Sequence, residues 1–332
     1  MEINLYSIFC RRHQRRILVL LALVFLSVMY YSKGTVAGLA TSGAPAAAAR
    51  INYSTKTGLS EHVDIIDLNE VTQDNFTCIK TKHLLHLVQT TLCLHDARDA
   101  VSNEIQQKQI WEERYLIPLF GFLIRYPHMS FIDAGANLGG YTMFAASLGR
   151  FVLSIECFKP NIDRIRKAVQ LERLQDKVVL VGNAIFSQSG DYLKIKSDPF
   201  NVGSQAIVVD SNMSNAKNDM YVVKTIRFDD LLPILKARNI RNAIMKVDIQ
   251  WSETFLCDTG HETFDYVNIP IVLMEWDVVP HYRDRIRNVL KFFIGHGYTA
   301  TTDMCKALNE SDALQSWPSD VFWMKLNRSD IC

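Results

Sequence analysis

Several short signatures are missing from this sequence of 332 residues. It has no Asp-x-Asp triplet, which many metal-dependent glycosyltransferases carry, and no cluster of His, Cys, Asp or Glu with a recognisable metal-ligand spacing. A large net charge is missing too. Residues 1–33 hold five basic residues and one acid, which leaves 31 basic and 34 acidic residues, a net charge of −3, for the rest. These absences favour a metal-independent protein whose main part does not bind nucleic acid.

One segment near the N-terminus is apolar enough to enter a membrane. Residues 17–31 read ILVLLALVFLSVMYY and follow the basic run RRHQRR. Fifteen residues are short for a hydrocarbon core of about 30 Å, but flanking residues and a thin bilayer narrow the gap. The positive-inside rule then predicts a cytosolic tail (1–16), a signal-anchor transmembrane helix (17–32) and a flexible stem (33–55) rich in Ala, Gly, Ser and Thr.

This arrangement predicts a type II membrane protein of the secretory pathway, in the Golgi membrane, with a lumenal catalytic domain. A cleaved signal peptide is the alternative and would make the protein secreted; a buried soluble helix is a third possibility. The chain after the anchor holds five N-glycosylation sequons, which favour a lumenal glycoprotein. They begin at Asn52, Asn75, Asn212, Asn309 and Asn327. Six cysteines also follow the anchor, and their pairing stays open; Cys157 and Cys257, beside apolar runs, are equally consistent with buried free thiols.

The fold is predicted from residue 111 onward, after a helical or mixed cap over 56–110 with helix-like spacing at 81–94. Continuous apolar runs at 130–135, 151–157, 178–185, 243–249 and 269–277 indicate strands covered on both faces. Helical patterns at 111–124, 139–148, 160–174 and 282–294 alternate with them, and a last strand pair lies at 298–302 and 321–326. We expect an α/β catalytic domain (111–332) with a doubly wound, mostly parallel sheet, and a β-hairpin insertion formed by 191–197 and 220–228.

A glycine turn follows the first of these strands. The loop DAGANLGG begins at Asp133, and Gly135 and Gly139 suit close backbone approach and tight entry to a helix. Glu156, 23 residues after Asp133 and at the end of the next strand, is placed to accept two ribose hydroxyls. A dinucleotide fingerprint would need glycine where Asn137 stands, and the acid before the turn suits a sulfonium better than a diphosphate. S-adenosylmethionine is therefore the expected cofactor.

Further motifs extend this pattern in order along the chain. DAGANLGGYT and SIECFKPN resemble the first two motifs of the FkbM-type S-adenosylmethionine-dependent methyltransferases. The similarity continues over about residues 111–300 through GNAIFSQSG, TIRFDDLL, KVDIQWSE and IVLMEWD. It implies the Rossmann-like fold of class I methyltransferases, in which S-adenosylmethionine is the cofactor.

The resemblance also implies roles for individual residues. Asp133, Gly135, Asn137 and Gly139 would shape the methionine end of the cofactor site, Glu156 would bind the ribose, and Asn183 and Ala184 would lie near the adenine. An acceptor would enter a cleft lined by Lys246, Asp248, Gln250, Trp251, Glu253, Glu275 and His281. Because a methyltransferase must take a proton from a hydroxyl acceptor, Asp248 and Glu275, with Lys246, are the candidate catalytic residues. A structural role stays open for Asp248, and for His281 a structural role is favoured.

One departure from the family pattern concerns the acceptor side. The family has Glu-Gly where this chain has Gln250 and Trp251, and a glutamine side chain cannot act as a base. The compartment favours a glycan or other glycoconjugate hydroxyl as acceptor, so the predicted function is a lumenal S-adenosylmethionine-dependent O-methyltransferase without a metal. Two alternatives stay open: a non-catalytic cofactor- or acceptor-binding pseudoenzyme, and a Golgi glycosyltransferase that lacks the Asp-x-Asp triplet.

Overall fold

The computed structural model describes residues 58–71, 74–196, 198, 200–212, 219–278 and 283–325, with the backbone alone at 209–212. All of these residues belong to one compact unit, 51–332. The predicted cytosolic tail, signal anchor and stem lie outside the described residues. Within the described ranges no helix combines the length and apolarity needed to cross a membrane.

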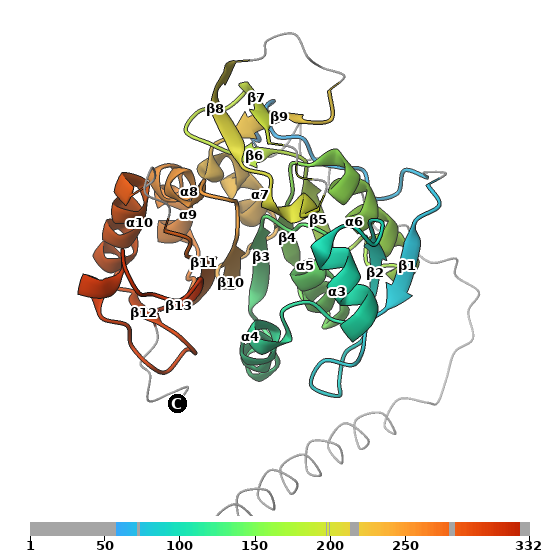
Figure 1. Ribbon diagram of the computed structural model, residues 1–332, viewed down its shortest axis with the longest axis horizontal. Coiled ribbons are helices and arrows are strands. Elements are labelled where there is room, and N and C mark those ends of the chain that lie inside the picture. The colour runs from blue at the N-terminus through green and yellow to red at the C-terminus, as the bar shows by residue number, and fades with distance from the viewer. Residues whose placement is uncertain are drawn as a thin grey trace, which may run out of the picture. The chain divides into compact units, whose positions relative to one another are not determined.

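The central element is a seven-stranded sheet with the order β12-β13-β11-β10-β3-β4-β5 (Figure 1). Its strands are β3 (Ser130–Ala134), β4 (Val152–Ile155), β5 (Val178–Val181), β10 (Ala243–Val247), β11 (Ile271–Glu275), β12 (Thr299–Thr301) and β13 (Asp320–Met324). β13 runs antiparallel to both of its neighbours, and the other adjacent pairs are parallel. The predicted doubly wound, mostly parallel sheet is confirmed.

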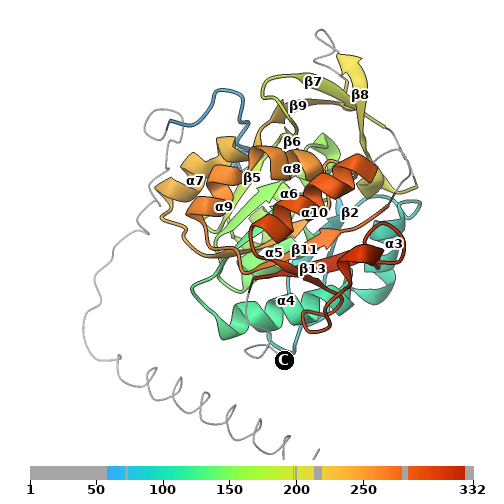
Figure 2. The same ribbon diagram turned by 90° about the vertical axis from the view of Figure 1, so that its left-hand side faces the viewer.

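Successive residues of β3 point to opposite faces of the sheet and enter different cores. Phe131 packs into one core with helices α4 (Glu113–Arg125), α5 (Gly140–Ser147) and α6 (Lys159–Glu172). Ile132 packs into a second core with α7 (Leu232–Ala237), α8 (Glu253–Thr259), α9 (His261–Tyr266) and α10 (Arg283–Gly295). Figure 2 shows α7, α8, α9 and α10 together on their side of the sheet. Helices on both faces explain why the strands read as unbroken apolar runs.

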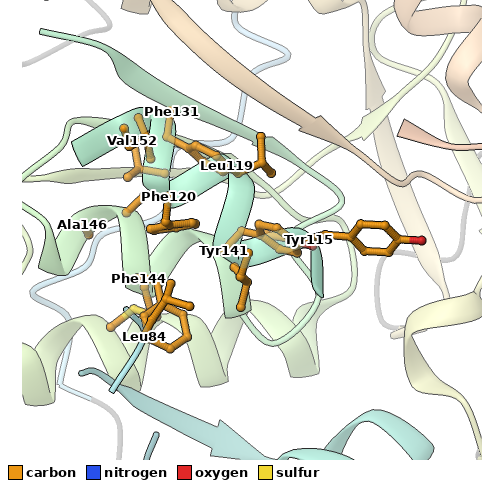
Figure 3. Packing of buried hydrophobic residues seen from close by; sticks show 14 of the residues in the cluster. Leu84, Tyr115, Leu119, Phe120, Phe131, Tyr141, Phe144, Ala146 and Val152 are labelled. Atoms are coloured by element: carbon orange, nitrogen blue, oxygen red, sulfur yellow. The ribbon is translucent and has the colours of Figure 1, made fainter. Parts of the chain in front are cut away.

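Aromatic side chains fill the first core beneath the glycine loop. The ring of Phe120 lies between Phe131 and Phe144, with centroid distances of 6.1 and 6.0 Å, and Tyr141 stacks on Phe131 at 6.3 Å (Figure 3). All four side chains are buried. This packing fixes α5, and with it the loop that enters the helix, against β3.

A smaller sheet of the order β6-β9-β7-β8 lies at the top of Figure 1. Its strands are β6 (Ala184–Ile185), β7 (Tyr192–Ile195), β8 (Ile207–Asn212) and β9 (Val222–Ile226), with a 3₁₀ turn, η1 (Val202–Ser204), before β8. The antiparallel pairing of β7 with β9 confirms the expected insertion. β8 is an addition, because the sequence analysis predicted only the two strands of the hairpin.

The prediction of helical structure over residues 81–94 is wrong. The segment belongs to an antiparallel hairpin of β1 (Thr77–Lys80) and β2 (Thr91–Leu94), in which Cys78 pairs with Cys93 in register and by a disulfide. Between the strands Leu85 and His86 have φ angles of 51° and 58°, a left-handed turn that no helix allows. The helix-like spacing of apolar residues in this segment arises because residues of the turn and of β2 pack on the same core.

The helices predicted at 111–124, 139–148, 160–174 and 282–294 are present, and four short helices were not predicted from the sequence. The additional helices are α3 (Ala100–Lys108), α7, α8 and α9.

The structure also describes several of the cysteines and sequon asparagines. Cys305 is disulfide-bonded, whereas Cys157 and Cys257 are free thiols. Of the five asparagines that begin the glycosylation sequons, Asn75 and Asn309 are exposed and Asn212 ends β8. Asn52 and Asn327 lie outside the described residues.

Candidate active site at the carboxyl ends of the strands

A pocket opens beyond the carboxyl ends of β3, β4 and β10, where the strand order reverses. Its empty volume is about 630 Å³, including the solvent at its mouth. Ligands of open α/β sheets bind at this switch point. Five of the predicted cofactor residues line the pocket: Gly135, Asn137, Glu156, Asn183 and Ala184.

The glycine loop turns sharply between β3 and α5. Gly135 has φ 80°, and a β-carbon there would lie 1.8 Å from the carbonyl oxygen of Asp248. Gly139 has the same φ and is the N-cap of α5. Glycine at 135 is therefore required by the close approach of the chain after β10, a reason that the sequence pattern alone does not reveal. Asn137, at φ 52°, uses the tolerance of asparagine for left-handed backbone.

Asp133 lies beneath this loop and does not line the pocket. Its side chain is fully buried, and Oδ2 accepts hydrogen bonds from the Thr142 amide at 2.9 Å and hydroxyl at 2.6 Å. Burial raises the pKa of Asp133 above its ordinary value. The interpretation of Asp133 as a charge facing the ligand is not supported by this position; the carboxyl group instead holds the first turn of α5.

Glu156 is the acidic side chain that the pocket does contain. Its carboxylate accepts hydrogen bonds from the amides of Asn137 at 2.7 Å and Phe158 at 2.8 Å. Burial raises the pKa of Glu156 to about 7, although these two amides oppose the shift. The carboxylate thus joins the glycine loop to the chain after β4 and presents its remaining lone pairs to the pocket.

Asn183 lines the pocket, but its amide is fully engaged elsewhere. Oδ1 accepts from the Asp64 amide at 2.7 Å, and Nδ2 donates to the carbonyls of His62 and Lys224 at 3.1 and 3.2 Å. The side chain therefore fastens the N-terminal segment and β9 to the end of β5.

The candidate catalytic residues Lys246, Asp248 and Glu275 come together beside the pocket. Lys246 Nζ donates to Asp248 Oδ2 at 3.1 Å and to the Gly135 carbonyl at 2.9 Å. Burial opposes the charge on Lys246, but nearby carboxylates, Asp248 first, raise its pKa above the ordinary value. Burial likewise works against the Asp248 charge, yet Lys246 holds the pKa of Asp248 below its ordinary value.

Gln250 connects the two candidate carboxylates. Its Nε2 donates to Asp248 Oδ1 at 2.8 Å and to Glu275 Oε2 at 2.9 Å. Burial, and then the charge of Asp248, raise the pKa of Glu275 well above its ordinary value. At neutral pH the pair therefore contains one ionised carboxylate, Asp248, and one protonated carboxyl group, Glu275.

The remaining acceptor-side residues border a second, smaller pocket of about 340 Å³, again counted with its mouth. Trp251 and Glu253 line it together with Glu275. The Trp251 indole donates to Asp277 Oδ2 at 3.2 Å, and Glu253 Oε1 accepts from the Ile249 amide at 3.1 Å. Burial raises the pKa of Glu253 to about 7. His281, the last predicted acceptor residue, lies outside the described residues.

Four polar residues near this site were not predicted from the sequence. Tyr141 OH donates to Glu112 at 2.9 Å, and its ring centroid lies 5.6 Å from Lys246 Nζ. Tyr115 OH donates to Asp320 at 2.9 Å. Tyr141 belongs to the DAGANLGGYT motif, which could have identified it. Asp320 could not be found in this way, because antiparallel β13 brings its first residue opposite the last residue of β11.

A metal site has no support among the residues that the structure describes. Within them, no three or more His, Cys, Asp or Glu side chains gather in an arrangement that could hold a metal ion. The charged groups are instead neutralised by Lys246 and by protonation.

The strand order, with its single antiparallel strand β13, defines the Rossmann-like class I methyltransferase fold. Solved structures with this fold include an O-methyltransferase from Bacillus cereus in complex with SAH, at 11% identity and TM-score 0.34 over 69% of this chain and 97% of that chain. The N-terminal domain of human METTL16 in complex with SAH matches at 10% identity and TM-score 0.32 over 68% and 80%. A SAM-dependent O-methyltransferase from Thermotoga maritima matches at 9% identity and TM-score 0.32 over 68% and 71%.

No family model matches the sequence, and no curated protein matches it either. Similarity this low carries nothing about cofactor or substrate. Both must be inferred from the residues of the site.

Proposed function

We propose that this protein is an S-adenosylmethionine-dependent O-methyltransferase of the FkbM type. The observation that carries the proposal is the position of Glu156, a buried carboxylate at the end of β4 that lines the pocket at the switch point. A carboxylate at this place binds the two hydroxyls of a ribose in nucleoside-binding α/β folds. Ligands that contain a pyrophosphate, such as dinucleotides, fit less well, because the neighbouring loop lacks the glycine spacing that a pyrophosphate needs.

The pocket has the properties that an adenosine-containing cofactor needs. Apolar side chains of Phe158, Ala184 and Ile195 cluster beyond Glu156 and suit the faces of a purine. Gln205 Oε1 is buried near this end and has no hydrogen-bond partner among the residues that the structure describes. These features support the cofactor from the site's own residues.

The charged group after β10 suits proton transfer from a hydroxyl acceptor. S-adenosylmethionine, when bound, supplies an electrophilic methyl group on a sulfonium. Asp248 is ionised and its side chain is 31% exposed, so it can take the proton that an acceptor hydroxyl releases. Lys246, whose side chain is only 7% exposed, holds Asp248 in place. Glu275, being protonated, can donate to an acceptor oxygen but cannot serve as the base.

The acceptor that we propose is a hydroxyl of a glycan or other glycoconjugate in the lumen of the secretory pathway. The sequence features that support this location are the apolar segment before residue 32 and the five sequons. The Cys78–Cys93 disulfide adds support, because disulfides persist in oxidising compartments. In such a compartment, exposed sugars are the most abundant hydroxyl acceptors.

A second candidate is a pseudoenzyme that binds the cofactor without methyl transfer. Gln250 favours it, because the amide of this residue donates to both candidate carboxylates and occupies lone pairs that a base would need. Methylation would then require Gln250 to move when an acceptor binds. The two candidates share the cofactor site and differ only in turnover.

Calorimetric titration of S-adenosylmethionine and S-adenosylhomocysteine into the full-length protein in mild detergent tests the cofactor site. Glu156→Gln keeps the shape of the side chain but removes the charge, and we expect a loss of affinity of about 10- to 100-fold. Lys108→Gln, on the exposed end of α3, is the matched control. A folded wild-type protein that binds neither compound overturns the proposal.

Incubation with methyl-labelled S-adenosylmethionine and a panel of oligosaccharides tests turnover. Label transfer that is lost in Asp248→Asn supports the enzyme. Saturable binding without transfer to any hydroxyl acceptor selects the pseudoenzyme.

A further inference from the structure

The insertion supplies one wall of the nucleoside pocket. Beyond the central sheet, the residues Val202, Gly203, Gln205 and Ile207 line the pocket together with the glycine loop and Glu156. They belong to η1 and the start of β8, the part of the insertion that the family motifs do not cover. Figure 1 places β7, β8 and β9 above the carboxyl ends of the central strands. The sequence motifs therefore say nothing about this wall.

Two hydrogen bonds fasten the wall to α3. The buried Asp99 carboxylate caps α3 through the Ser102 amide at 2.8 Å, and its other oxygen accepts from the Val202 amide at 3.0 Å. The Ala100 amide donates to the Phe200 carbonyl at 2.8 Å. One side chain thus joins the helix N-terminus to η1 and sets the position of the segment that follows.

The wall also touches the glycine loop directly. A β-carbon at Gly203 would lie 2.4 Å from Asn137 Nδ2, so the backbone of η1 packs against that side chain. Asn161 Nδ2 lies 3.4 Å from Asn137 Oδ1 on the side of α6. The loop, α6 and the insertion therefore meet around Asn137.

Beyond this contact the lining of the pocket is apolar, and we call this part of the pocket the apolar slot. Phe158, Ala184 and Ile195 form one buried cluster, and Val202 and Ile207 of the insertion pack against it. Phe158 is also the residue whose amide binds Glu156. The slot therefore lies directly beyond the carboxylate that would bind the ribose, where the base of a nucleoside would be placed.

Two side-chain amides border this slot, and among the described residues only Gln205 has a carbonyl oxygen that accepts no hydrogen bond. The amide of Asn183 is committed to Asp64, His62 and Lys224. Gln205 Oε1 is buried and, within the described residues, has no hydrogen-bond partner. A buried acceptor without a donor is costly, so such an atom indicates a missing ligand group or water.

Resting on the proposed function, we infer that Gln205 Oε1 accepts a hydrogen bond from the exocyclic amino group of the cofactor's adenine. The insertion then recognises the adenine base, next to which the family resemblance had placed Asn183 and Ala184. The wall also shields the hydrogen bond from water, because Val202 and Ile207 flank Gln205 on both sides along the chain. Recognition of the base and closure of the pocket are thereby supplied by the same segment.

A thermodynamic cycle that combines one change in the ligand with one change in the full-length protein tests this inference. S-adenosylhomocysteine and its analogue with hydrogen in place of the 6-amino group are titrated calorimetrically into wild type and into Gln205→Leu. We expect wild type to bind the analogue about tenfold more weakly, and Gln205→Leu to bind both compounds equally. Gln205→Glu, which keeps an acceptor oxygen, retains the preference for the amino group. Phe200→Ser, at a side chain that is 67% exposed, is the control and behaves like wild type.

The outcomes separate the two proposals. If wild type does not bind S-adenosylhomocysteine, the proposed function fails and this inference fails with it. If wild type binds and Gln205→Leu keeps the full preference for the amino group, the inference is wrong while the proposed function stands. The inference is equally wrong if wild type binds both compounds alike.

Discussion

The carbonyl oxygen of Asp248 lies so close to Gly135 that a β-carbon added to the glycine would stand 1.8 Å from it. Gly135 directly follows β3, and Asp248 directly follows β10, the neighbouring parallel strand. Lys246 Nζ also donates to the Gly135 carbonyl at 2.9 Å. The glycine loop and the charged group are thus one structural unit, and a change on one strand must move the other.

Gly135→Ala should unfold this junction. The new methyl group meets backbone, which cannot move aside, and the φ of 80° adds left-handed strain. We expect a loss of about 2–5 kcal/mol in the free energy of unfolding, measured by chemical denaturation. Gly140→Ala is the matched control one turn away, because a β-carbon there meets no atom within 4 Å. Equal stability of the two variants would contradict the observed contact.

Glu156 should make stability depend on pH. Its carboxyl group has an ordinary pKa of 4.5 and a folded value of about 7, so between these pH values the folded chain keeps a proton that the unfolded chain releases. The free energy of unfolding therefore falls as pH rises from 4.5 to about 7, and is constant above. The fall amounts to at most about 3.5 kcal/mol, since one pKa unit corresponds to about 1.4 kcal/mol.

Denaturation of wild type and Glu156→Gln at several pH values measures this effect. Glu253 also has a pKa of about 7 because of burial, so wild type should show two such contributions. Glu156→Gln should remove one of them and gain stability relative to wild type at pH 8. Glu253→Gln should remove the other. Parallel pH profiles for wild type and both variants would count against the raised values.

The sequence predicted those parts of the fold in which local pattern and burial agree. β3, β4 and β10 have both faces covered, so most of their residues are apolar on both faces. The glycine loop and Glu156 follow such strands directly, which is why the pocket could be located. The segment 81–94 was misassigned because spacing alone cannot distinguish a helix from turn residues that pack on one core.

Other parts of the site depend on contacts between distant segments. Glu275 and Asp320 are opposite in the β11–β13 pairing although 45 residues separate them, and only the topology brings them together. Gln205 follows a short 3₁₀ turn whose position is set by Asp99, more than 100 residues earlier. No local pattern marks either relationship. The same holds for Gly135, whose steric reason lies on another strand.

Gln250→Glu should test the charge balance of the cluster. The substitution replaces an amide that donates to Asp248 and Glu275 with a third carboxyl group. At pH 8 its charge would face ionised Asp248, and we expect a loss of about 1–3 kcal/mol in the free energy of unfolding. The loss should shrink toward pH 5, because the new carboxyl group is then protonated.

Gln250→Met provides the comparison, since it removes both hydrogen bonds without adding charge. Its stability relative to wild type should change little between pH 5 and pH 8. A Gln250→Glu protein as stable as wild type at pH 8 would show that a further cation or a proton balances the cluster.

Trp251 should reverse the usual stability order of glycine and alanine variants. The residue has φ 65° in the turn after β10, where the family motif has glycine. Trp251→Gly and Trp251→Ala both lose the indole and its bond to Asp277. Alanine still bears the strain of left-handed backbone, so Trp251→Gly should be more stable than Trp251→Ala by about 1 kcal/mol in chemical denaturation. The neighbouring Ser252 has φ −100°, and there the alanine variant should be the more stable one. If glycine were the less stable substitution at both positions, the left-handed turn would not be the reason for the glycine of the family motif. The tryptophan would then have to be explained by its contacts in the second pocket alone.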